Sequence, residues 1–597
     1  MNHQAENATP SHRIRRRTVL GGFAIGAVGV LLAACGTTAP ATSAPGASLA
    51  PATPAAGAPA TAPTGGAGLP TPTTTTGAAR ATSAATVVPR TTATAGALTS
   101  TPGTPSGAVV FASPTAPRRT AAARGELRLA LGFDFPAKLD ALKNTHLLPY
   151  GMLETLTRQT PQNTLEPWLA ERVASVDPTT WRVTLREGAK FWDGSAVTAA
   201  DVIAAFKKNW EAFPDGKGII SPDTRMTAVD PRTVEFTTPE PSGIFPYALS
   251  LTNFAIHKPS TAGGADGGVM TGPYRPTKFT VDNELVVEPF ADHWSGIPPI
   301  ARISIRYVPD PNARILALQS GDVDMLYNFP PEAIKGFGPD IVATATPSGR
   351  VDLINLNLQR PPFDDRAVRE AMSVAIDRSI LNTVGLDGRG TPLNTLFPTG
   401  IGYETVPLQG TDVARARQLL DGAGWAVGGD GIRAKGGQRL AFTLLSYPGR
   451  AQLTPYAVSI QSQLKPLGFD VQVKEVQNVT DVTKTGDWDA TMKSNNMLPT
   501  GDPLYELNRL VGKDGGDNVG LYSSPQVEAL LAQLRVVLDP ARRQELSKQI
   551  QGVVKADIPD LFLVVGPITT AYKKGKIQNY TPHPNDSYLI DTGLTVS

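Results

Sequence analysis

A long segment of low-complexity sequence limits which part of this 597-residue chain can fold. Between residues 36 and 122, 75 of 87 residues are Gly, Ala, Ser, Thr or Pro. Such a segment has too few large apolar side chains to offset the entropy of ordering its backbone. We therefore predict a disordered linker, spanning on the order of 50 Å as a coil and about 270 Å in extended polyproline form. A globular structure is expected only from residues 123–597.

The residues before the linker have the parts of a bacterial export signal. Four arginines lie within residues 13–17, an apolar run follows over residues 19–32, and two alanines precede Cys35. The run is shorter than the roughly 20 residues that span a bilayer and is rich in Gly, which argues against a permanent membrane helix. We predict a signal peptide over residues 1–35. The pair Arg16-Arg17 also matches a twin-arginine export signal.

Cys35 is the only cysteine in the chain and ends the sequence Leu-Ala-Ala-Cys. This sequence resembles the lipobox of bacterial lipoproteins, in which the cysteine carries the lipid and becomes the mature N-terminus. Each buried CH₂ of an acyl chain contributes about 0.8 kcal/mol, so several chains on one cysteine anchor a protein stably. We expect lipidation of Cys35 and attachment to the outer face of the cell membrane. The alternative is a cysteine that falls in an apolar run by chance.

Charge and composition exclude several classes of function for the folded part. Residues 1–122 contain eight arginines and one glutamate, so the remaining 475 residues carry −5 of the total charge of +2. A mildly acidic fold argues against nucleic-acid binding. One cysteine excludes an intramolecular disulfide and a CxxC site, and the six histidines lack the spacing of a zinc site. The chain also lacks a Gly-x-Ser-x-Gly elbow and a P-loop, so we expect neither an enzyme nor a cofactor.

Strand and helix patterns alternate along residues 123–597, which predicts an α/β fold. Strands are expected at 126–131, 181–186, 301–308, 324–327, 353–358, 440–445 and 469–474, and helices at 198–210, 312–320, 365–382, 413–420, 453–464, 527–538 and 540–556. Thr198 is expected to cap its helix, with Asp201 in the positive first turn. Asp364 is expected to cap the helix that starts near residue 365.

Several short motifs follow one another in the order found in one protein family. They lie at residues 153–157, 165–171, 180–202, 271–274, 307–324, 363–371 and 423–425, and at Trp294. The most distinctive, at 180–202, has Trp192 where the family usually has His. Together they make residues 125–597 resemble the family 5 extracytoplasmic solute-binding proteins of ABC transporters, the oligopeptide, dipeptide and nickel-binding group.

The resemblance implies a two-lobed α/β fold of the periplasmic-binding-protein type (type II, family 5) with a hinge that closes on a ligand. We place lobe I at residues 123–358, lobe II at 359–562 and the return to lobe I at 563–597, with crossings near 358–362 and 559–565. Members of the family deliver a solute to permease and ATPase subunits and catalyse no reaction. We therefore expect a monomeric, membrane-anchored importer component that binds a small molecule or peptide and no nucleic acid.

The ligand class follows less directly from the resemblance. Peptide-binding members hold the peptide amine with an aspartate ahead of an Asp-Pro pair, and in this chain that position falls on or near Pro499. Nickel-binding members clamp a metal chelate with arginines, and residues 249–260 contain none. We expect a small peptide or peptide-like solute, with a nickel or metal-chelate receptor and a sensory lipoprotein without transport as alternatives.

Five residues are candidates for contact with the ligand. They are Tyr150, Asn253, Asn496, Asp502 and Tyr505. Tyrosine and asparagine suit a pocket because they combine contact area with adaptable hydrogen bonding. Each of the five could instead pack or form a turn within the fold, and the pair Asp502-Pro503 is itself a turn signal. Four tryptophans are expected in the core or in lobe-stabilising positions, namely Trp181, Trp192, Trp294 and Trp425, and His146 could approach the ligand.

Overall fold

The computed structural model describes residues 109–113, 118–132, 138–142, 147–261, 267–398, 403, 408–448, 450–590 and 593–597. The predicted signal peptide, Cys35, most of the predicted linker and His146 lie outside the described residues. None of the helices in the described part combines the length and the apolar composition of a membrane span.

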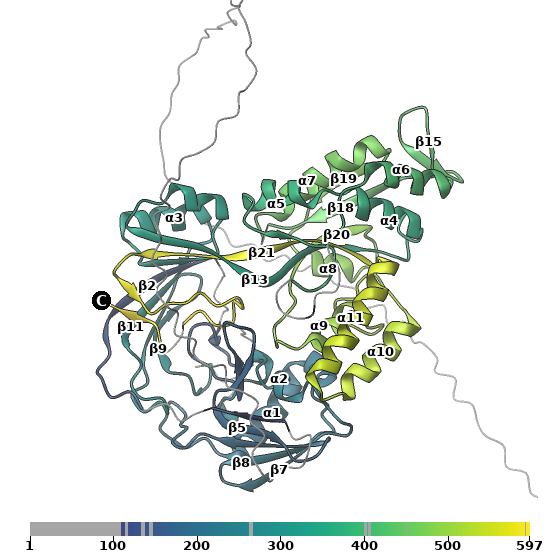
Figure 1. Ribbon diagram of the computed structural model, residues 1–597. Helices are drawn as coiled ribbons and strands as arrows, with labels where there is room; N and C mark the ends of the chain where they lie inside the picture. Colours follow the sequence, from purple (N-terminus) through teal and green to yellow (C-terminus); the bar gives the residue numbers. More distant parts are fainter. Residues whose placement is uncertain are drawn as a thin grey trace, which may run out of the picture. The chain divides into compact units, whose positions relative to one another are not determined.

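An eleven-stranded mixed sheet runs through both lobes of the described chain (Figure 1). Its strands are β2 (Arg124–Leu131), β9 (Tyr274–Thr280), β10 (Glu284–Pro289), β11 (Ile300–Tyr307), β12 (Met325–Tyr327), β13 (Ile341–Leu356), β14 (Thr391–Pro392), β18 (Ala441–Ser446), β19 (Asp470–Glu475), β20 (Ala490–Asn496) and β21 (Asp560–Lys573). They lie in the order β19-β18-β20-β13-β21-β12-β2-β11-β10-β9, and β14 pairs with β21. By the predicted bounds, the strands up to β12 belong to lobe I, and β18, β19 and β20 belong to lobe II.

Two long antiparallel strands, β13 and β21, connect the lobes. They pair from Ile341 opposite Lys573 to Asn355 opposite Asp560. The register shifts between Pro347 and Val351, which marks an irregularity in the middle of the ladder. On one side of this ribbon the sheet continues through β12 and β2, and on the other through β20 and β18. The predicted crossings near 358–362 and 559–565 therefore lie beside one end of the ribbon, where β13 ends and β21 begins.

A second, antiparallel sheet lies within lobe I and packs against α1 (Ala199–Ala212). Its order is β1 (Val110–Ala112), β5 (Ala170–Ser175), β6 (Thr180–Leu185), β8 (Thr233–Thr237) and β7 (Arg225–Asp230). Thr198 caps α1 in a reciprocal capping box with Asp201, which confirms the expected helix start. Trp181 is buried and stacks on Phe245 at a centroid distance of 5.7 Å.

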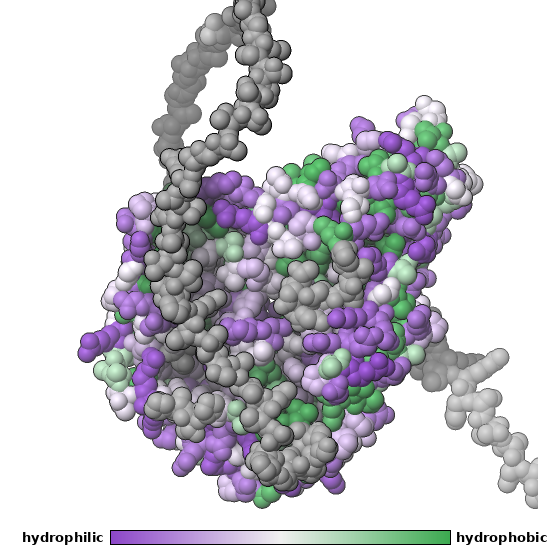
Figure 2. Space-filling view, viewed as in Figure 1, coloured by the Kyte–Doolittle hydropathy of each residue, from purple (hydrophilic) through white to green (hydrophobic). Residues whose placement is uncertain are grey.

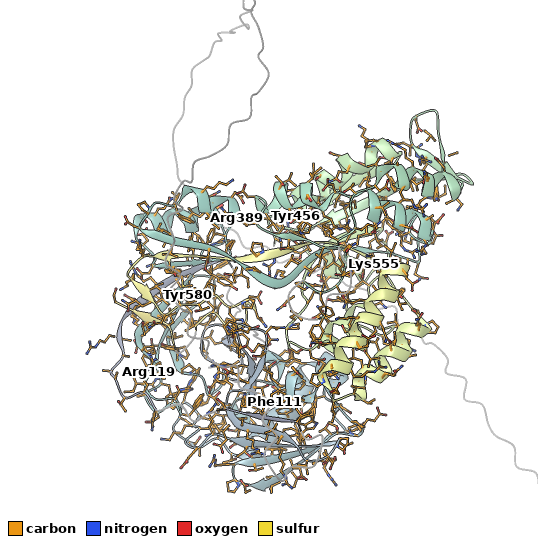
Figure 3. All side chains as sticks on the ribbon, in the orientation of Figure 1. Phe111, Arg119, Arg389, Tyr456, Lys555 and Tyr580 are labelled. Atoms are coloured by element: carbon orange, nitrogen blue, oxygen red, sulfur yellow. The ribbon has the colours of Figure 1, made fainter. Side chains whose placement is uncertain are left out.

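The first strand of this sheet comes from the segment predicted to be linker. Val110 pairs with Ala174, and the Phe111 ring lies 6.1 Å from the Tyr247 ring (Figure 3). Residues 109–111 are Val-Val-Phe, an apolar cluster within the low-complexity sequence. This cluster supplies the apolar surface that the rest of the segment lacks, so the strand forms although composition alone predicts a linker up to residue 122.

The remaining elements are mostly helices of lobe II. The helices are α2 (Phe245–Ala248), α3 (Pro311–Ser320), α4 (Arg366–Ala375), α5 (Arg378–Leu386), α6 (Val413–Gly422), α7 (Leu453–Leu464), α8 (Val479–Thr483), α9 (Pro503–Val511), α10 (Pro525–Val536) and α11 (Pro540–Asp557). Short strands form β3 (Thr157–Gln159) with β4 (Leu165–Pro167), β15 (Ala426–Val427) with β16 (Arg433–Lys435) and β17 (Gln438–Arg439), and β22 (Ile577–Gln578) with β23 (Thr595–Val596). Short 3₁₀ turns are η2 (Pro214–Gly218), η3 (Thr252–Phe254), η4 (Pro259–Thr261), η5 (Pro331–Gly336) and η6 (Lys465–Leu467).

The helix expected over residues 365–382 is wrong as a single helix. It forms as α4 and α5, and its cap is Asp365 rather than Asp364. The break has a local cause, because the Asp377 side chain accepts hydrogen bonds from the amides of Ser379 and Ile380 and starts a second helix. By contrast, α3 ends as expected at Gly321, which adopts a positive φ of 89°.

A continuous hydrophobic core joins the second sheet of lobe I to helices α9, α10 and α11 of lobe II. Trp181 and Phe245 on one side and Leu507 and Val527 on the other belong to this core. Close packing requires Gly243, since a Cβ there would lie 2.0 Å from the Val537 carbonyl oxygen. We call this contact the apolar interface. On the face shown in Figure 2, polar and apolar residues are otherwise interspersed.

Candidate ligand-binding site

Loops leave the carboxyl ends of two parallel strands, β18 and β20, at one edge of the lobe II sheet. Ligands of α/β proteins commonly bind beyond such strand ends. Tyr447, Pro448 and Arg450 follow β18, and Asn496 ends β20. Because β13 runs antiparallel to β20, it places Arg350 directly opposite Asn496. We name this group the strand-end cluster: Arg350, Asp352, Tyr447, Arg450 and Asn496, together with Asp586 from the C-terminal segment.

Arg350 is the centre of the strand-end cluster. Its Nη2 donates a 2.6 Å hydrogen bond to Asp586 Oδ2, and its Nη1 donates to the Ser494 carbonyl at 3.2 Å. Burial opposes the charge of Arg350, but the attraction of Asp586 outweighs burial and raises the pKa of the guanidinium. The two side chains are nonetheless 19 % and 28 % exposed. The pair is thus both desolvated and partly accessible to solvent.

The other charged members of the cluster are also desolvated. Asp352 is fully buried, and burial raises the pKa of its carboxyl group. Gln452 Nε2 donates to both carboxylate oxygens of Asp352, at 3.3 and 3.1 Å. Burial and then repulsion from Arg350 lower the pKa of Arg450 to about 10. Burial also raises the pKa of the half-buried Tyr447. The cluster thus combines charge, aromatic surface and partial access.

Direct hydrogen bonds join the lobes next to this cluster. Gln159, in β3 of lobe I, donates from Nε2 to the carbonyl of Leu498 in lobe II at 2.9 Å. Gln159 Oε1 accepts a 2.6 Å bond from Asn585 Nδ2 on the C-terminal segment. Asn585 Oδ1 in turn accepts a 3.4 Å bond from Asn496 Nδ2. We call this set of contacts the polar seam. The polar seam connects the lobes through hydrogen-bonding groups that could bond to water or to a ligand instead.

A cavity of about 540 Å³ lies between residues of the two lobes. Residues 217–221 and 238–242 of lobe I form one side, and α9, the loop at 514–517 and Arg535 form the other. The volume is within the usual range for small-ligand sites. Its lining mixes apolar side chains with hydroxyl, amide and charged groups, which suits a small polar solute with some apolar surface.

An ion-pair network stiffens the lobe II wall of this cavity. Arg509 Nη2 contacts Glu506 Oε2 at 2.7 Å and the same guanidinium contacts Asp517. Burial raises the pKa of Glu506, while Arg509 opposes that shift. Asp517 also accepts a 3.2 Å hydrogen bond from Asn495 Nδ2 in β20. This network links the cavity wall to the strand that carries Asn496.

Two of the predicted site residues lie at these features. Asn496 belongs to both the strand-end cluster and the polar seam, and its Oδ1 accepts a 3.1 Å hydrogen bond from the Leu498 amide. Tyr505 lines the cavity from α9, with Arg509 5.8 Å from its ring centroid. The structure therefore brings Asn496 and Tyr505 to the region where the lobes meet.

The other three predicted residues have different surroundings. Asp502 is buried and caps α9, and its two oxygens accept bonds of 2.8 and 2.6 Å from Arg543 Nε and Nη2. Its carboxylate is thus engaged within the apolar interface. Tyr150 is buried in the core of lobe I. Asn253 is half-buried in η3 and does not line the 540 Å³ cavity. Ligand contact by these three residues remains a prediction.

Sequence reasoning missed Arg350, Arg450, Gln159, Asn585 and Asp586. The position of Arg450 just after a parallel strand, in the sequence Tyr-Pro-Gly-Arg, was an available signal. The pairing of Arg350 with Asp586 had none, because 236 positions separate the two residues. Among the described residues, no group of three or more His, Cys, Asp or Glu could hold a metal ion.

The sequence of this chain matches a known protein family whose fold agrees with the one described above. Residues 164–518 match the family described as "Bacterial extracellular solute-binding proteins, family 5 Middle". The chain belongs to this family. The resemblance of the sequence to family 5 solute-binding proteins and the expected two-lobed α/β fold are thus confirmed.

The alignments of this chain with its curated relatives cover nearly the whole length of those relatives. The chain is 25 % identical over 470 residues to the nickel-binding protein NikA of Staphylococcus aureus, covering 76 % of this chain and 93 % of the relative. It is 28 % identical over 504 residues to the glutathione-binding protein GsiB of Escherichia coli, covering 79 % and 94 %. The crystal structure of Staphylococcus aureus NikA with Ni(L-His)₂ aligns with a TM-score of 0.70 at 24 % identity, over 79 % of this chain and all of that chain. These relatives are substrate-binding proteins of ABC transporters rather than enzymes.

Proposed function

We propose that this protein is the lipid-anchored substrate-binding component of an ABC importer and that it captures a small peptide or peptide-like solute. The observation that carries the proposal is the 540 Å³ cavity with one wall from each lobe. The family supports the role, since homologues are extracytoplasmic solute receptors that work with permeases. Hydroxyl, amide and charged groups together with apolar side chains are the lining that a short peptide requires.

Closure on the ligand would use the two-stranded connection between the lobes. Contacts from both lobes stabilise a closed state only when the ligand is present between them. The polar seam suits such a step, because its hydrogen bonds can be exchanged for bonds to water at little net cost. Binding and delivery therefore need no bond-making chemistry.

A metal chelate is the second candidate ligand. The relative from Staphylococcus aureus is named as nickel-binding, and Arg450 of the strand-end cluster could offer donors to a carboxylate of a chelate. Mass spectrometry of the molecule that co-purifies with the full chain distinguishes the two candidates. A short peptide or peptide-like compound supports the proposal, and a nickel complex supports the alternative.

Small-angle scattering of the full chain with the identified ligand tests closure. We expect a smaller radius of gyration at saturation. An unchanged radius at saturating ligand would contradict closure. The same result would not affect the membership of the chain in the family.

Cys35 provides a test of the proposed anchor. We expect Cys35→Ala to move the protein from the membrane fraction to the soluble extracytoplasmic fraction, because several acyl chains are lost. Ser43→Ala, within the proposed linker, is a matched control and should leave the protein in the membrane fraction. Retention of Cys35→Ala in the membrane fraction would refute the anchor.

A further inference from the structure

The carboxylate of Asp586 pairs with the guanidinium of Arg350. Its Oδ2 lies 2.6 Å from Arg350 Nη2. This is a charge-assisted hydrogen bond, roughly twice as strong as a neutral one. Arg350 has a second partner in the Ser494 carbonyl. Both terminal nitrogens of Arg350, Nη1 and Nη2, thus already have an acceptor from the chain itself.

The segment that carries Asp586 is held to lobe I on both sides. Asn585 bonds to Gln159 through its side chain, and the Asn585 amide donates to His583 Nδ1 at 2.9 Å. The Gln159 amide donates to the Tyr588 hydroxyl at 3.2 Å, and the Ile590 amide donates to the Pro149 carbonyl at 3.1 Å. These contacts hold the Asp586 carboxylate in its position before a ligand binds. The pair with Arg350 is therefore part of the folded structure.

The pair lies where the lobes meet rather than in a closed core. Arg350 faces Asn496 across the β13–β20 ladder, and the neighbouring Asn585 touches Asn496. Both members of the pair keep part of their surface accessible, at 19 % and 28 %. Tyr580, which is labelled in Figure 3, belongs to the same C-terminal segment, and its side chain is half-buried. A solute between the lobes at this edge of the sheet would meet a neutralised arginine.

Two acidic side chains lie in the electrostatic surroundings of both arginines of the strand-end cluster. Asp586 and Asp352 each act on Arg350 and on Arg450. Placing a like charge beside a desolvated carboxylate costs several kcal/mol in general, which makes such a residue a filter for the charge of a ligand. A ligand group with a negative charge would have to displace Asp586 or lie beside it.

We propose that Asp586 is a specificity-determining residue that supplies the counterion of Arg350 and so excludes an anionic group of the ligand from this part of the site. The proposal rests on the proposed function, because it assigns a charge preference to a solute bound between the two lobes; the strand-end cluster itself is not part of the lining of the 540 Å³ cavity. The receptor accordingly accepts a solute whose end at the strand-end cluster is neutral or cationic. Loss of the Asp586 charge makes Arg350 available to a carboxylate.

Two peptides that differ by one charge test this selectivity. The probes are tri-alanine and its C-terminal amide, with binding to the full chain measured by calorimetry. We expect the wild-type protein to prefer the amide by at least about tenfold. Asp586→Asn should reverse the preference towards the free carboxylate. The double variant Arg350→Gln with Asp586→Asn should lose this gain, because neither charge is left.

The controls separate this proposal from the proposed function. Asp487→Asn removes an exposed acid that pairs with Arg360 and should leave the ratio of affinities unchanged. Thermal unfolding verifies that each variant folds, and Asp586→Ser serves as a second charge-removing variant should the amide variant not fold. A ratio unchanged in both Asp586 variants, or no binding of either peptide to any form, overturns the charge filter. Mass spectrometry of the co-purified ligand and the scattering experiment on closure test the proposed function independently.

Discussion

Two of the contacts between lobe I and lobe II within the described part of the chain differ in their chemistry. At the apolar interface, side chains such as Phe245 and Leu507 are completely buried and share one core. At the polar seam, Gln159 bonds to Leu498 and Asn585 bonds to Asn496 across the lobes, next to a partly exposed ion pair. Separating the first contact would expose apolar surface, whereas separating the second exchanges protein hydrogen bonds for bonds to water. The polar seam is therefore the side that can open at the lower cost.

The difference also explains the roles of two aspartates. Asp502 is 2 % exposed in its side chain and is paired with Arg543, which is 4 % exposed. Asp586 pairs with Arg350 at a partly accessible position. The first pair is enclosed by the fold, and the second remains within reach of a solute. Both are Asp–Arg ion pairs, but the first stabilises the fold and the second, by our proposal, determines which ligands are accepted.

The largest effect is expected from breaking the enclosed pair. Arg543→Ala leaves the Asp502 carboxylate buried and also removes bonds to the carbonyls of Leu534 and Val537. We expect a loss of about 3–5 kcal/mol in the free energy of unfolding, measured by denaturant titration. The control Arg302→Ala breaks exposed pairs and should cost under about 1 kcal/mol. Equal losses in the two variants would show that the apolar interface does not depend on this pair.

A smaller effect is expected at the polar seam. Gln159→Ala removes hydrogen bonds to Leu498 and Asn585 and leaves buried partners unsatisfied, so the free energy of unfolding should fall by about 1–3 kcal/mol. The affinity for the co-purified ligand should fall as well, because the seam borders the candidate site. Gln549→Ala, on the exposed face of α11, is the matched control. If Gln159→Ala binds the ligand as tightly as wild type, the polar seam takes no part in closure.

The smallest effect is expected in the pH dependence of stability. Burial raises the pKa of Asp352 above the value of about 3.9 that it has in the unfolded chain. The folded state therefore holds this proton more tightly, so the contribution of Asp352 to stability is full below about pH 4 and is lost as pH rises towards the folded pKa. Asp352→Asn should flatten the stability profile in that window. The profile of Asp487→Asn should match wild type, and an unflattened profile for Asp352→Asn would exclude this carboxyl as its source.

Much of the fold could be predicted because its signals are local. The capping box of α1 depends on Thr198 and Asp201, three positions apart, and Gly321 ends α3 by its own backbone freedom. The break at Asp377 could not be predicted. The Asp377 side chain accepts hydrogen bonds from backbone amides and so starts a second helix, but an aspartate in a helical pattern does not indicate such bonds until the backbone is known.

The candidate site depends on contacts that are remote in sequence. Asn496 and Tyr505 could be proposed from a family motif, but the role of Asp502 was set by Arg543, 41 positions away. Gln159 and Asn585 are 426 positions apart and meet only because β13 and β21 bring the chain back to lobe I. No pattern within one segment carries that information.

The irregularity in the ribbon of β13 and β21 has a mechanical consequence. The ladder is interrupted between Pro347 and Val351, and interrupted ladders bend and twist more readily than regular ones. Arg350 lies within this short stretch, so the irregular part of the ribbon also carries the guanidinium held by Asp586. A change in the twist of the ribbon at this place would therefore move Arg350 directly relative to Asp586.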